Sequence, residues 1–528
     1  MVKYYIVGAN MSKGILKGTF ILTIAGFIVK AIGSINWIIL SRVLGGEGIG
    51  IYQMAFPIYF LALTISSAGI PVAISIITAE KAAKEDYVGA HRVFKVSLTL
   101  ICAAAFLLSA MVFFGSKWLI DMHIIRESRA YYSLIALSPA IFFAAIISCY
   151  RGYLQGWQMM TPTALSQIVE QLVRVVVMLL FASWLLPYGL DFAAGGASLG
   201  AGAGAFVALL LLIYYYYKLQ RSLPKTSNKE FPYESTRHIF KRIVMLAVPI
   251  SLASILLPLV ANLDLLVVPR RLETAGYTTS QATELFGYLT GMAVPLVNLA
   301  TIITAALAVS LVPAISNAHT LHDKKAIYDH TSSAMRLSLL ATIPFAVMLY
   351  VLAEPIVTFI YNAPAAKDAT QILAIAIFFL GIHQVTTGIL QGFAKPKIPV
   401  INMGISAIVK VFLNWNLTAI PWLGIAGAAY ATVVDIGFAA ALNLYFIHRY
   451  TGYLLNLTDL LRNSVSALVM GIGMYFLYGF ISQHTGIFIS LLVTVMTGSL
   501  LYAVIMIALG GLSVQDAKKL PFINKFIN

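Results

Sequence analysis

The chain has 528 residues, of which 60% are hydrophobic and only 10% are charged, and its mean hydropathy is +0.88. Soluble globular proteins carry about 25% charged residues, so this composition excludes a soluble domain and predicts an all-α polytopic membrane protein. The formal net charge of +15 does not indicate binding to nucleic acid. The lysines and arginines lie mostly between apolar segments, where the positive-inside rule places them.

Long runs with few charges predict the membrane-spanning helices, because about 20 apolar residues cross roughly 30 Å of hydrocarbon. We predict about fourteen such helices. Their approximate ranges are 14–40, 50–79, 90–115, 130–153, 161–187, 192–217, 240–268, 284–316, 327–352, 370–393, 398–420, 424–447, 460–481 and 486–510. No small-residue cleavage site follows the first span, so we expect it to remain as a helix. Cys102 and Cys149 both lie in spans, which argues against a disulfide framework.

The two halves of the chain repeat each other. The stretch 152–175 recurs as 388–411, with Leu-Gln-Gly near its start and one basic residue near its end in both copies. A second echo links 73–98 with 314–339. Each half would hold six helices, an even number, so the repeats have the same orientation and are related by an axis along the membrane normal.

This repeat predicts four parts of the chain. They are an N-terminal six-helix lobe at 1–219, a cytoplasmic linker at 220–238, a C-terminal six-helix lobe at 239–450, and two extra helices with a cytoplasmic tail at 451–528. Lysine and arginine are concentrated in the loops on the side of the linker. Both termini are therefore expected in the cytoplasm.

Charged residues within the spans are the candidates for function, because each costs several kcal/mol unless it faces a cavity or a partner. Three cations and three acids lie there: Lys30, Arg174, Lys410, Glu170, Asp264 and Asp435. The predicted outer ends of the spans add Arg42, Arg270 and Arg271. Together these residues predict a cationic cavity for an anionic ligand of the phosphate class. Structural ion pairing is the alternative. It suits Glu170 and Arg174, which share one helix face, better than Lys30, which has no acid in its own span.

Other functional signals in the sequence are weak. His319, His322 and Asp323 form a loose metal-ligand pattern in a loop, so no metal and no cofactor are predicted beyond coupling to Na⁺ or H⁺. The chain lacks a nucleotide-binding glycine–lysine motif and a nucleophile–base arrangement, so we expect that it is not an enzyme. Prolines within the spans indicate kinks, which serve either as hinges or only for packing.

Several short motifs resemble a known family. Residues 30–33 (KAIG), 41–45 (SRVLG), 48–52 (GIGIY) and 67–71 (SAGIP) resemble the polysaccharide-biosynthesis or stage V sporulation protein B branch of the multidrug/oligosaccharidyl-lipid/polysaccharide (MOP) flippase superfamily. The paired Leu-Gln-Gly turns do so too, and the resemblance covers essentially the whole chain. It implies a V-shaped central cavity that carries an undecaprenyl-pyrophosphate-linked sugar, such as lipid II, from the inner to the outer leaflet.

The resemblance also implies roles for particular residues and the location of the protein in the bacterial cytoplasmic (inner) membrane. Related lipid II flippases have essential arginines on their first helix. Lys30 takes a similar place here, with the charge but without the bidentate fork of arginine. The last two helices would form a groove for the lipid tail.

The combined interpretation is a flippase driven by the membrane potential or by ion coupling. Its predicted substrate-binding residues are Lys30, Arg42, Arg174, Arg270 and Lys410. Its predicted ion-coupling or gating residues are Glu170, Asp264 and Asp435. The expected partners are the lipid-linked saccharide, the bilayer and cell-wall synthesis proteins, and no nucleic acid. A cation-coupled multidrug antiporter of the same fold is the main alternative, and it predicts a cavity dominated by acids and a plan of twelve helices. A non-transporting scaffold for envelope or spore-coat assembly is a third.

Overall fold

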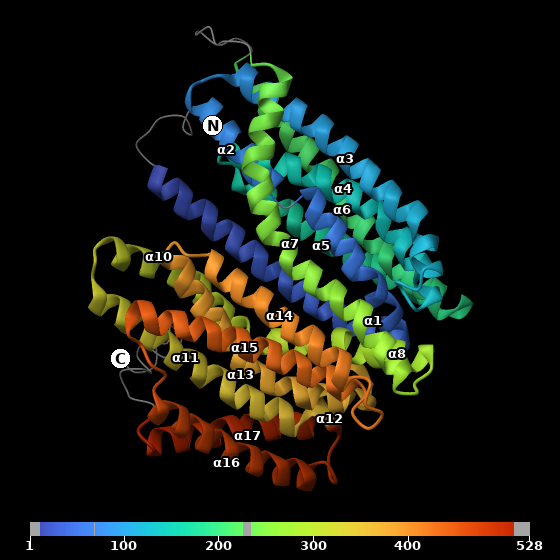
Figure 1. Cartoon of the computed structure of the whole chain (residues 1–528), viewed down its shortest axis with the longest axis vertical. Helices are drawn as coiled ribbons and strands as arrows, with labels where there is room; N and C mark the ends of the chain where they lie inside the picture. The colour runs from blue at the N-terminus through green and yellow to red at the C-terminus, as the bar shows by residue number, and fades with distance from the viewer. Residues whose placement is uncertain (1–10, 68, 225–233, 512–528) are drawn as a thin grey trace. The chain divides into compact units, whose positions relative to one another are not determined.

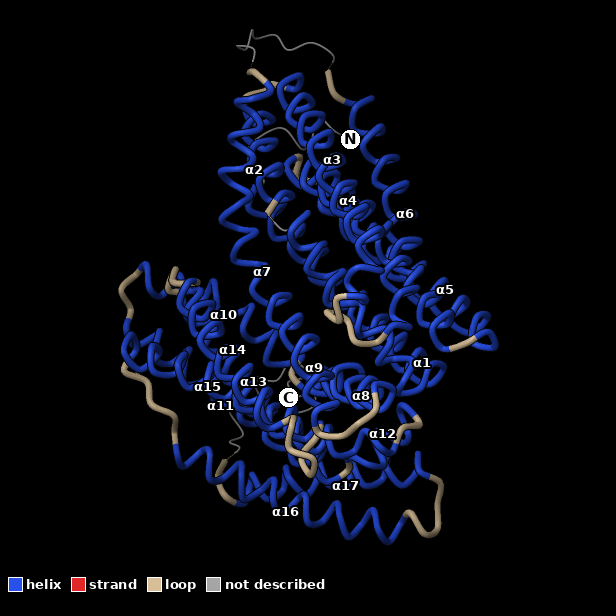
Figure 2. The backbone as a smooth tube through the Cα atoms, turned by 45° about the vertical axis from the view of Figure 1, so that its right-hand side comes forward, coloured by secondary structure: helices blue, strands red, loops and turns tan. Residues whose placement is uncertain are grey.

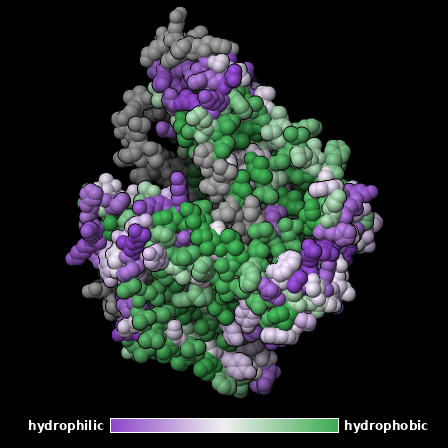
Figure 3. Space-filling view, in the orientation of Figure 1, coloured by the Kyte–Doolittle hydropathy of each residue, from purple (hydrophilic) through white to green (hydrophobic). Residues whose placement is uncertain are grey.

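The computed structural model describes residues 11–67, 69–224 and 234–511, and every regular element in these ranges is a helix (Figures 1 and 2). Twelve helices in the described ranges are long and apolar enough to cross a membrane. The predicted all-α polytopic fold is therefore confirmed. In Figure 3 the visible sides of the helices are mostly hydrophobic, as a surface that faces lipid requires.

The helices of the first half of the chain are α1 (Met11–Ser67), α2 (Ile70–Ala83), α3 (Tyr87–Asp121), α4 (Tyr131–Gly156), α5 (Met160–Leu185) and α6 (Leu190–Ser222). Those that follow are α7 (Thr236–Thr274), α8 (Thr279–Phe286), α9 (Val294–Ala300), α10 (Ile302–Thr320), α11 (Lys324–Val351), α12 (Ala353–Tyr361), α13 (Lys367–Gly392), α14 (Lys397–Leu417), α15 (Ile425–Thr451), α16 (Leu457–Ile481) and α17 (Ile487–Ala508). Short 3₁₀ turns occur at η2 (Ser128–Ala130), η3 (Leu186–Tyr188) and η5 (Pro364–Ala366), and a π-helical turn at η4 (Gly287–Ala293).

The helix α1 consists of two segments that fold back on each other. Gly45 breaks the helical backbone between them, with φ 66° and ψ −176°. The rings of Trp37 and Tyr52 lie 5.7 Å apart, although a continuous helix would separate their Cα atoms by about 22 Å. The candidate span Ile24–Ala83, which is 60 residues long, therefore contains two of the predicted spans.

Two other predicted spans differ in the structure. The helix α7 covers the predicted span 240–268 but is not among the twelve candidate spans of the described residues. The predicted span 284–316 is interrupted, because it passes through the end of α8, the π-helical η4 and the short α9. In this region only α10 (Ile302–Thr320) is long and apolar enough to cross a membrane. A charge-free stretch does not reveal such breaks, because they depend on backbone geometry.

Tertiary packing divides the chain into two compact units. Unit 1 contains Met1–Pro269 and Thr279–Gly287, and unit 2 contains Arg270–Thr278 and Tyr288–Asn528. Most of α7 and all of α8 thus pack with the first unit. The predicted lobes were defined by the sequence repeat, whereas the two units are defined by tertiary packing. The packing therefore does not test the predicted boundary at 220–238, which remains a prediction. Residues 225–233 of that linker lie outside the described ranges.

The repeated Leu-Gln-Gly stretch has the same packing role in both units. A side chain at Gly152 of α4 would overlap the carbonyl oxygen of Pro71 in α2, and one at Gly388 of α13 would overlap that of Ala308 in α10. The final glycine of each motif approaches the same neighbouring helix equally closely. Glycine is therefore required here because two helix backbones touch, which explains why the motif occurs twice.

The turn between the two segments of α1 is held by α8, within unit 1. A Cβ atom at Gly50 would overlap the carbonyl oxygen of Thr283, and one at Gly287 would overlap that of Gly46. The glycine-rich stretch 45–50 is thus a docking surface for α8. This contact with α8 explains why the stretch 45–50, shortly after Arg42, is rich in glycine.

An ion cluster secures the same corner of unit 1. Arg129 donates to both carboxylate oxygens of the buried Glu127, at 2.9 and 2.8 Å, and also pairs with Glu47 at 2.9 Å. Thr283 donates to Glu127 at 3.0 Å, and Ser280 donates to Glu47. Burial raises the pKa of Glu127, but the hydrogen bonds and charge of Arg129 outweigh it, so the net pKa lies below its ordinary value.

We expect Gly50→Ala to lower the thermal stability of the purified protein, because the new methyl group must displace α8. The loss should be roughly 1–3 kcal/mol, the usual range for overpacking. Gly26→Ala is the matched control within α1, since nothing lies within 4 Å of its added Cβ. It should be neutral or stabilising by up to about 1 kcal/mol. Equal unfolding temperatures for the two variants in detergent would contradict the docking of α8 on this stretch.

The lowered pKa of Glu127 predicts a pH-dependent contribution to stability. A carboxylate whose pKa is depressed by folding stabilises the protein above its unfolded pKa of about 4.3 and loses this effect as the pH falls through its lower folded pKa. Glu127→Gln should therefore destabilise the protein at pH 7, and the difference from the unaltered protein should shrink below about pH 4. Asp121→Asn, at an exposed site, is the control. A pH-independent difference for Glu127→Gln would contradict this account.

Candidate functional site

Unit 1 contains a charged network inside its spans, built from α4 and α5. Glu170 accepts a hydrogen bond from Arg151 at 2.9 Å and one from Arg174 at 3.0 Å. Arg151 also donates to Ser166 at 2.9 Å. The three charged side chains are only 17–23% exposed. Two guanidinium groups thus share one carboxylate, and the network keeps a surplus positive charge.

Both segments of α1 lie against this network. A Cβ atom at Gly33 in the first segment would be 3.2 Å from the side-chain nitrogen of Gln171. In the second segment, the hydroxyl of Tyr59 interacts with Arg174. Lys30 lies about one helical turn before Gly33, so its backbone is near the depth of Glu170. The Lys30 side chain is exposed and has no ion pair with any described residue.

Unit 2 has a polar network at the corresponding positions of the repeat. The alignment of 152–175 with 388–411 matches Arg151 with Thr387 and Ser166 with Asn402. Asn402 donates to Asn443 of α15 at 2.8 Å, and Asn443 donates to Thr387 at 3.2 Å. Equivalent positions of the repeat therefore carry polar side chains in both units, and we call these side chains the polar layer. At these positions the layer contains the charged Arg151 in unit 1 but only neutral groups in unit 2.

The next turn of α14 carries the charges of unit 2. Ser406, which matches Glu170, donates to Asp435 of α15 at 2.6 Å. Lys410, which matches Arg174, lies one turn further along α14 and is only 6% exposed. In unit 1 the acid Glu170 and the cation Arg174 thus lie on the same helix, α5. In unit 2 the cation Lys410 lies on α14 and the acid Asp435 on the neighbouring α15. A buried ammonium and a half-buried carboxylate inside a span are the kind of groups that function or strong pairing must maintain.

The structure groups only some of the predicted site residues. It brings Glu170 and Arg174 together, as their spacing predicts. Asp264 is half-buried in α7, and Arg42 is exposed at the end of the first segment of α1. Arg270 is exposed, with its guanidinium carbon 5.8 Å from the centre of the Trp415 ring within unit 2, and Arg271 stacks on the same ring at 4.6 Å. The predicted roles of all these residues remain predictions.

The sequence did not predict the role of Arg151, which forms an ion pair with Glu170 in this site. Arg151 is not among the charged residues that the sequence singles out within the spans, because it lies at the end of the predicted span 130–153. In the structure α4 continues to Gly156, so Arg151 stays within the helix and reaches Glu170. Its position directly before the repeated glycine was an available signal. The described residues show no group of three metal-ligating side chains, and the histidine pattern at 319–323 forms no such group.

Two helical units, each with a polar layer inside its spans, make up this polytopic membrane protein, and its matches are to membrane flippases and transporters rather than to enzymes. The chain belongs to the polysaccharide biosynthesis protein family, whose model matches residues 15–319. A second model, MatE, matches residues 289–416.

Relatives cover nearly the whole chain. Stage V sporulation protein B of Bacillus subtilis is 28% identical over 97% of this chain and 98% of its own length. Lipid II flippase MurJ of the same organism is 28% identical over 91% of this chain and 90% of its own.

Solved structures show the same fold. A lipid II flippase MurJ in an inward closed conformation aligns with a TM-score of 0.70, at 17% identity, over 92% of this chain and 98% of its own. An inward-facing multidrug resistance MATE transporter of the MOP superfamily aligns with a TM-score of 0.64, at 16% identity, over 80% and 94%.

We expect Glu170→Gln to destabilise the protein more than Arg174→Met. The first leaves two guanidinium groups inside the span without an acid, whereas the second leaves Glu170 paired with Arg151. The difference should be about 2 kcal/mol, below the 3–5 kcal/mol of a fully buried pair because these side chains are partly exposed. Thermal unfolding in detergent measures it. The double variant should be less destabilised than Glu170→Gln alone. Equal effects of the two single changes would refute the shared-carboxylate arrangement.

Proposed function

We propose that this protein moves an undecaprenyl-pyrophosphate-linked saccharide, such as lipid II, from the inner to the outer leaflet of the bacterial cytoplasmic membrane. We propose that both termini lie in the cytoplasm, because lysine and arginine are concentrated in the loops on that side. The head group crosses about 30 Å of hydrocarbon while its prenyl tail stays in lipid. Alternating access by two repeats is the mechanism that such transporters use.

One observation carries this proposal: the surplus positive charge at span depth in unit 1. Glu170 neutralises only one of Arg151 and Arg174, and Lys30, near the same depth, has no acid among the described residues. In addition, the buried Nε of Arg174 finds no acceptor in the described part of the chain. Cations in a low-dielectric surrounding attract an anionic ligand, and a pyrophosphate carries enough charge to compensate several of them.

The relatives support this choice of substrate class. One of the proteins similar over nearly the whole chain is named a lipid II flippase, and so is the solved structure with a TM-score of 0.70. We infer the same class of cargo here. The other proposed substrate-binding residues, Arg42, Arg270 and Lys410, would meet the head group at other stages of transport.

We propose that the membrane potential or an ion gradient drives transport. Moving an anion outward is favoured by an inside-negative potential, by about 2.3 kcal/mol per charge and 100 mV. Glu170, Asp264 and Asp435 would open and close ion pairs during the cycle, or bind a coupling Na⁺ or H⁺. No further cofactor is proposed, and cell-wall synthesis proteins would receive the product.

A cation-coupled multidrug antiporter is the second candidate, favoured by the MatE match and the similarity to a MATE transporter. That function needs acids that attract a cationic drug. The surplus guanidinium in unit 1 favours an anion instead, so we rank the flippase first.

The proposal predicts that Lys30→Ala abolishes flipping without abolishing folding. A fluorescent lipid II analogue in proteoliposomes with an imposed potential measures transport. Loss of a charge-assisted contact should reduce the initial rate roughly tenfold or more. Lys30→Arg should retain activity, because it keeps the charge. Lys117→Ala is the control, since it removes an exposed lysine outside the predicted spans.

The same assay separates the candidates. Transport of the analogue by the unaltered protein, lost in Lys30→Ala and Arg174→Met but not in Lys117→Ala, supports the flippase. Transport of cationic drugs with no movement of the analogue would establish the antiporter. Full activity of Lys30→Ala would remove Lys30 from the site.

A further inference from the structure

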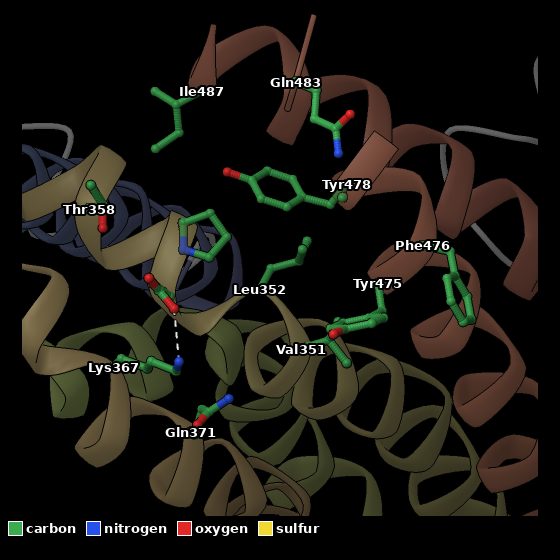
Figure 4. A pocket seen from close by; sticks show the side chains of 13 residues that line it. Val351, Leu352, Thr358, Lys367, Gln371, Tyr475, Phe476, Tyr478, Gln483 and Ile487 are labelled. Atoms are coloured by element: carbon green, nitrogen blue, oxygen red, sulfur yellow. Dashed lines mark hydrogen bonds and ion pairs between the residues drawn. The ribbon is translucent and has the colours of Figure 1, made fainter. Parts of the chain in front are cut away.

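A pocket of about 670 Å³ in unit 2 is lined by side chains near the ends of several helices, and none of them belongs to the polar layer (Figure 4). Five helices reach it: α11 ends at Val351, α12 supplies Glu354, α13 begins at Lys367, α16 ends at Ile481 and α17 begins at Ile487. The charge distribution predicts that these helix ends face the outside. The pocket thus lies where helices leave the membrane, at the level of lipid head groups.

The wall of the pocket carries one ion pair and a set of polar groups. Lys367 donates to one carboxylate oxygen of Glu354 at 2.8 Å, and the two side chains are 41% and 55% exposed. Gln371, Gln483 and Tyr478 also line the pocket. The pair is neutral overall, but each partner keeps capacity for a ligand. The ammonium has further N–H donors, and the carboxylate has a second oxygen.

An apolar groove of about 620 Å³ adjoins this pocket and shares Val351 with it. The groove lies between α11, α13 and α16. Its lining on α11 runs from Ile343 to Val351 and on α16 from Leu460 to Ile472. These stretches are about 12 and 18 Å long, close to the roughly 15 Å hydrocarbon depth of one leaflet.

A head-group pocket with one cation and one anion, joined to an apolar groove of leaflet length, fits one class of molecule. We propose that it binds a zwitterionic phospholipid of the phosphatidylethanolamine class. The lipid phosphate contacts Lys367, the lipid ammonium contacts Glu354, and an acyl chain lies along the α11–α13–α16 groove. The lipid held against α16 is not the transported cargo, so this inference does not rest on the proposed function.

Charge disfavours the anionic lipids that could enter the groove. A pyrophosphate-linked lipid would bring several negative charges next to Glu354, and only one lysine of the lining opposes them. Phosphatidylglycerol carries an anion but no ammonium to satisfy the carboxylate. A head group without a hydrocarbon chain would leave the apolar groove exposed, and burial of about one acyl chain supplies most of the expected affinity.

The test uses the full-length protein in detergent and compares added dioleoylphosphatidylethanolamine with dioleoylphosphatidylglycerol. Native mass spectrometry counts bound lipid, and thermal unfolding reports stabilisation. We expect the phosphatidylethanolamine adduct to exceed the phosphatidylglycerol adduct by about threefold, within the range of a partly exposed ion pair. Glu354→Lys, with two cations, should reverse this order. The double swap Glu354→Lys with Lys367→Glu should restore it.

Three controls make the outcome decisive. Lys117→Glu changes an exposed lysine outside the pocket and should leave the preference unaltered. Ala346→Phe fills the groove without changing its charge and should reduce binding of both lipids. Phosphoethanolamine without acyl chains should not stabilise the protein. Equal binding of the two lipids, an unchanged preference in Glu354→Lys, full stabilisation by phosphoethanolamine, or displacement of the lipid by undecaprenyl pyrophosphate in competition would each overturn the proposal.

Discussion

The carboxylate of Glu170 holds two arginines inside a part of the chain that spans the membrane. Either guanidinium alone would be difficult to keep at that depth, because a cation in hydrocarbon needs a partner or water. One acid shared by Arg151 and Arg174 fixes α4 and α5 together and yet leaves positive charge available. The close packing of α1 on α5, at Gly33 and Gln171, then brings the first helix to the same depth. The candidate site of unit 1 depends on this one side chain.

The second half of the chain meets the same need with different chemistry. Where the first half has Arg151 and Ser166, the repeat has Thr387 and Asn402, which are joined through Asn443 by neutral hydrogen bonds. Where the first half has Glu170, the repeat has Ser406, and the acid is Asp435 on the neighbouring helix. Duplicated halves can therefore conserve helix packing while their charges diverge. Under the proposed function, an anionic head group would be attracted mainly by unit 1.

The sequence predicted those features that depend on local chemistry. Apolar runs located nearly all the spans, the repeated Leu-Gln-Gly stretch marked equivalent helix contacts, and the spacing of Glu170 and Arg174 predicted their ion pair. Other features depend on contacts between distant segments. The pairing of Arg151 with Glu170, the docking of α8 on the glycine stretch at 45–50, and the break of the predicted span 284–316 into three helices and a π-helical turn needed the fold. Hydropathy alone does not carry this information, since it averages over the backbone geometry that decides where a helix ends.

The charges of the two sites separate two kinds of lipid. The network around Glu170 has more cations than acids and therefore suits a multiply charged pyrophosphate. The pocket at Lys367 and Glu354 is balanced and suits a zwitterion, although it adjoins a groove that any lipid chain could enter. If both sites had a surplus of cations, cargo and bulk lipid would compete for both. Under the two proposals, this difference in charge balance would let the protein keep a phospholipid against α16 while the cargo head group engages α1 and α5. The apolar tails would then be interchangeable, and the charge of the head group would determine which lipid occupies which site.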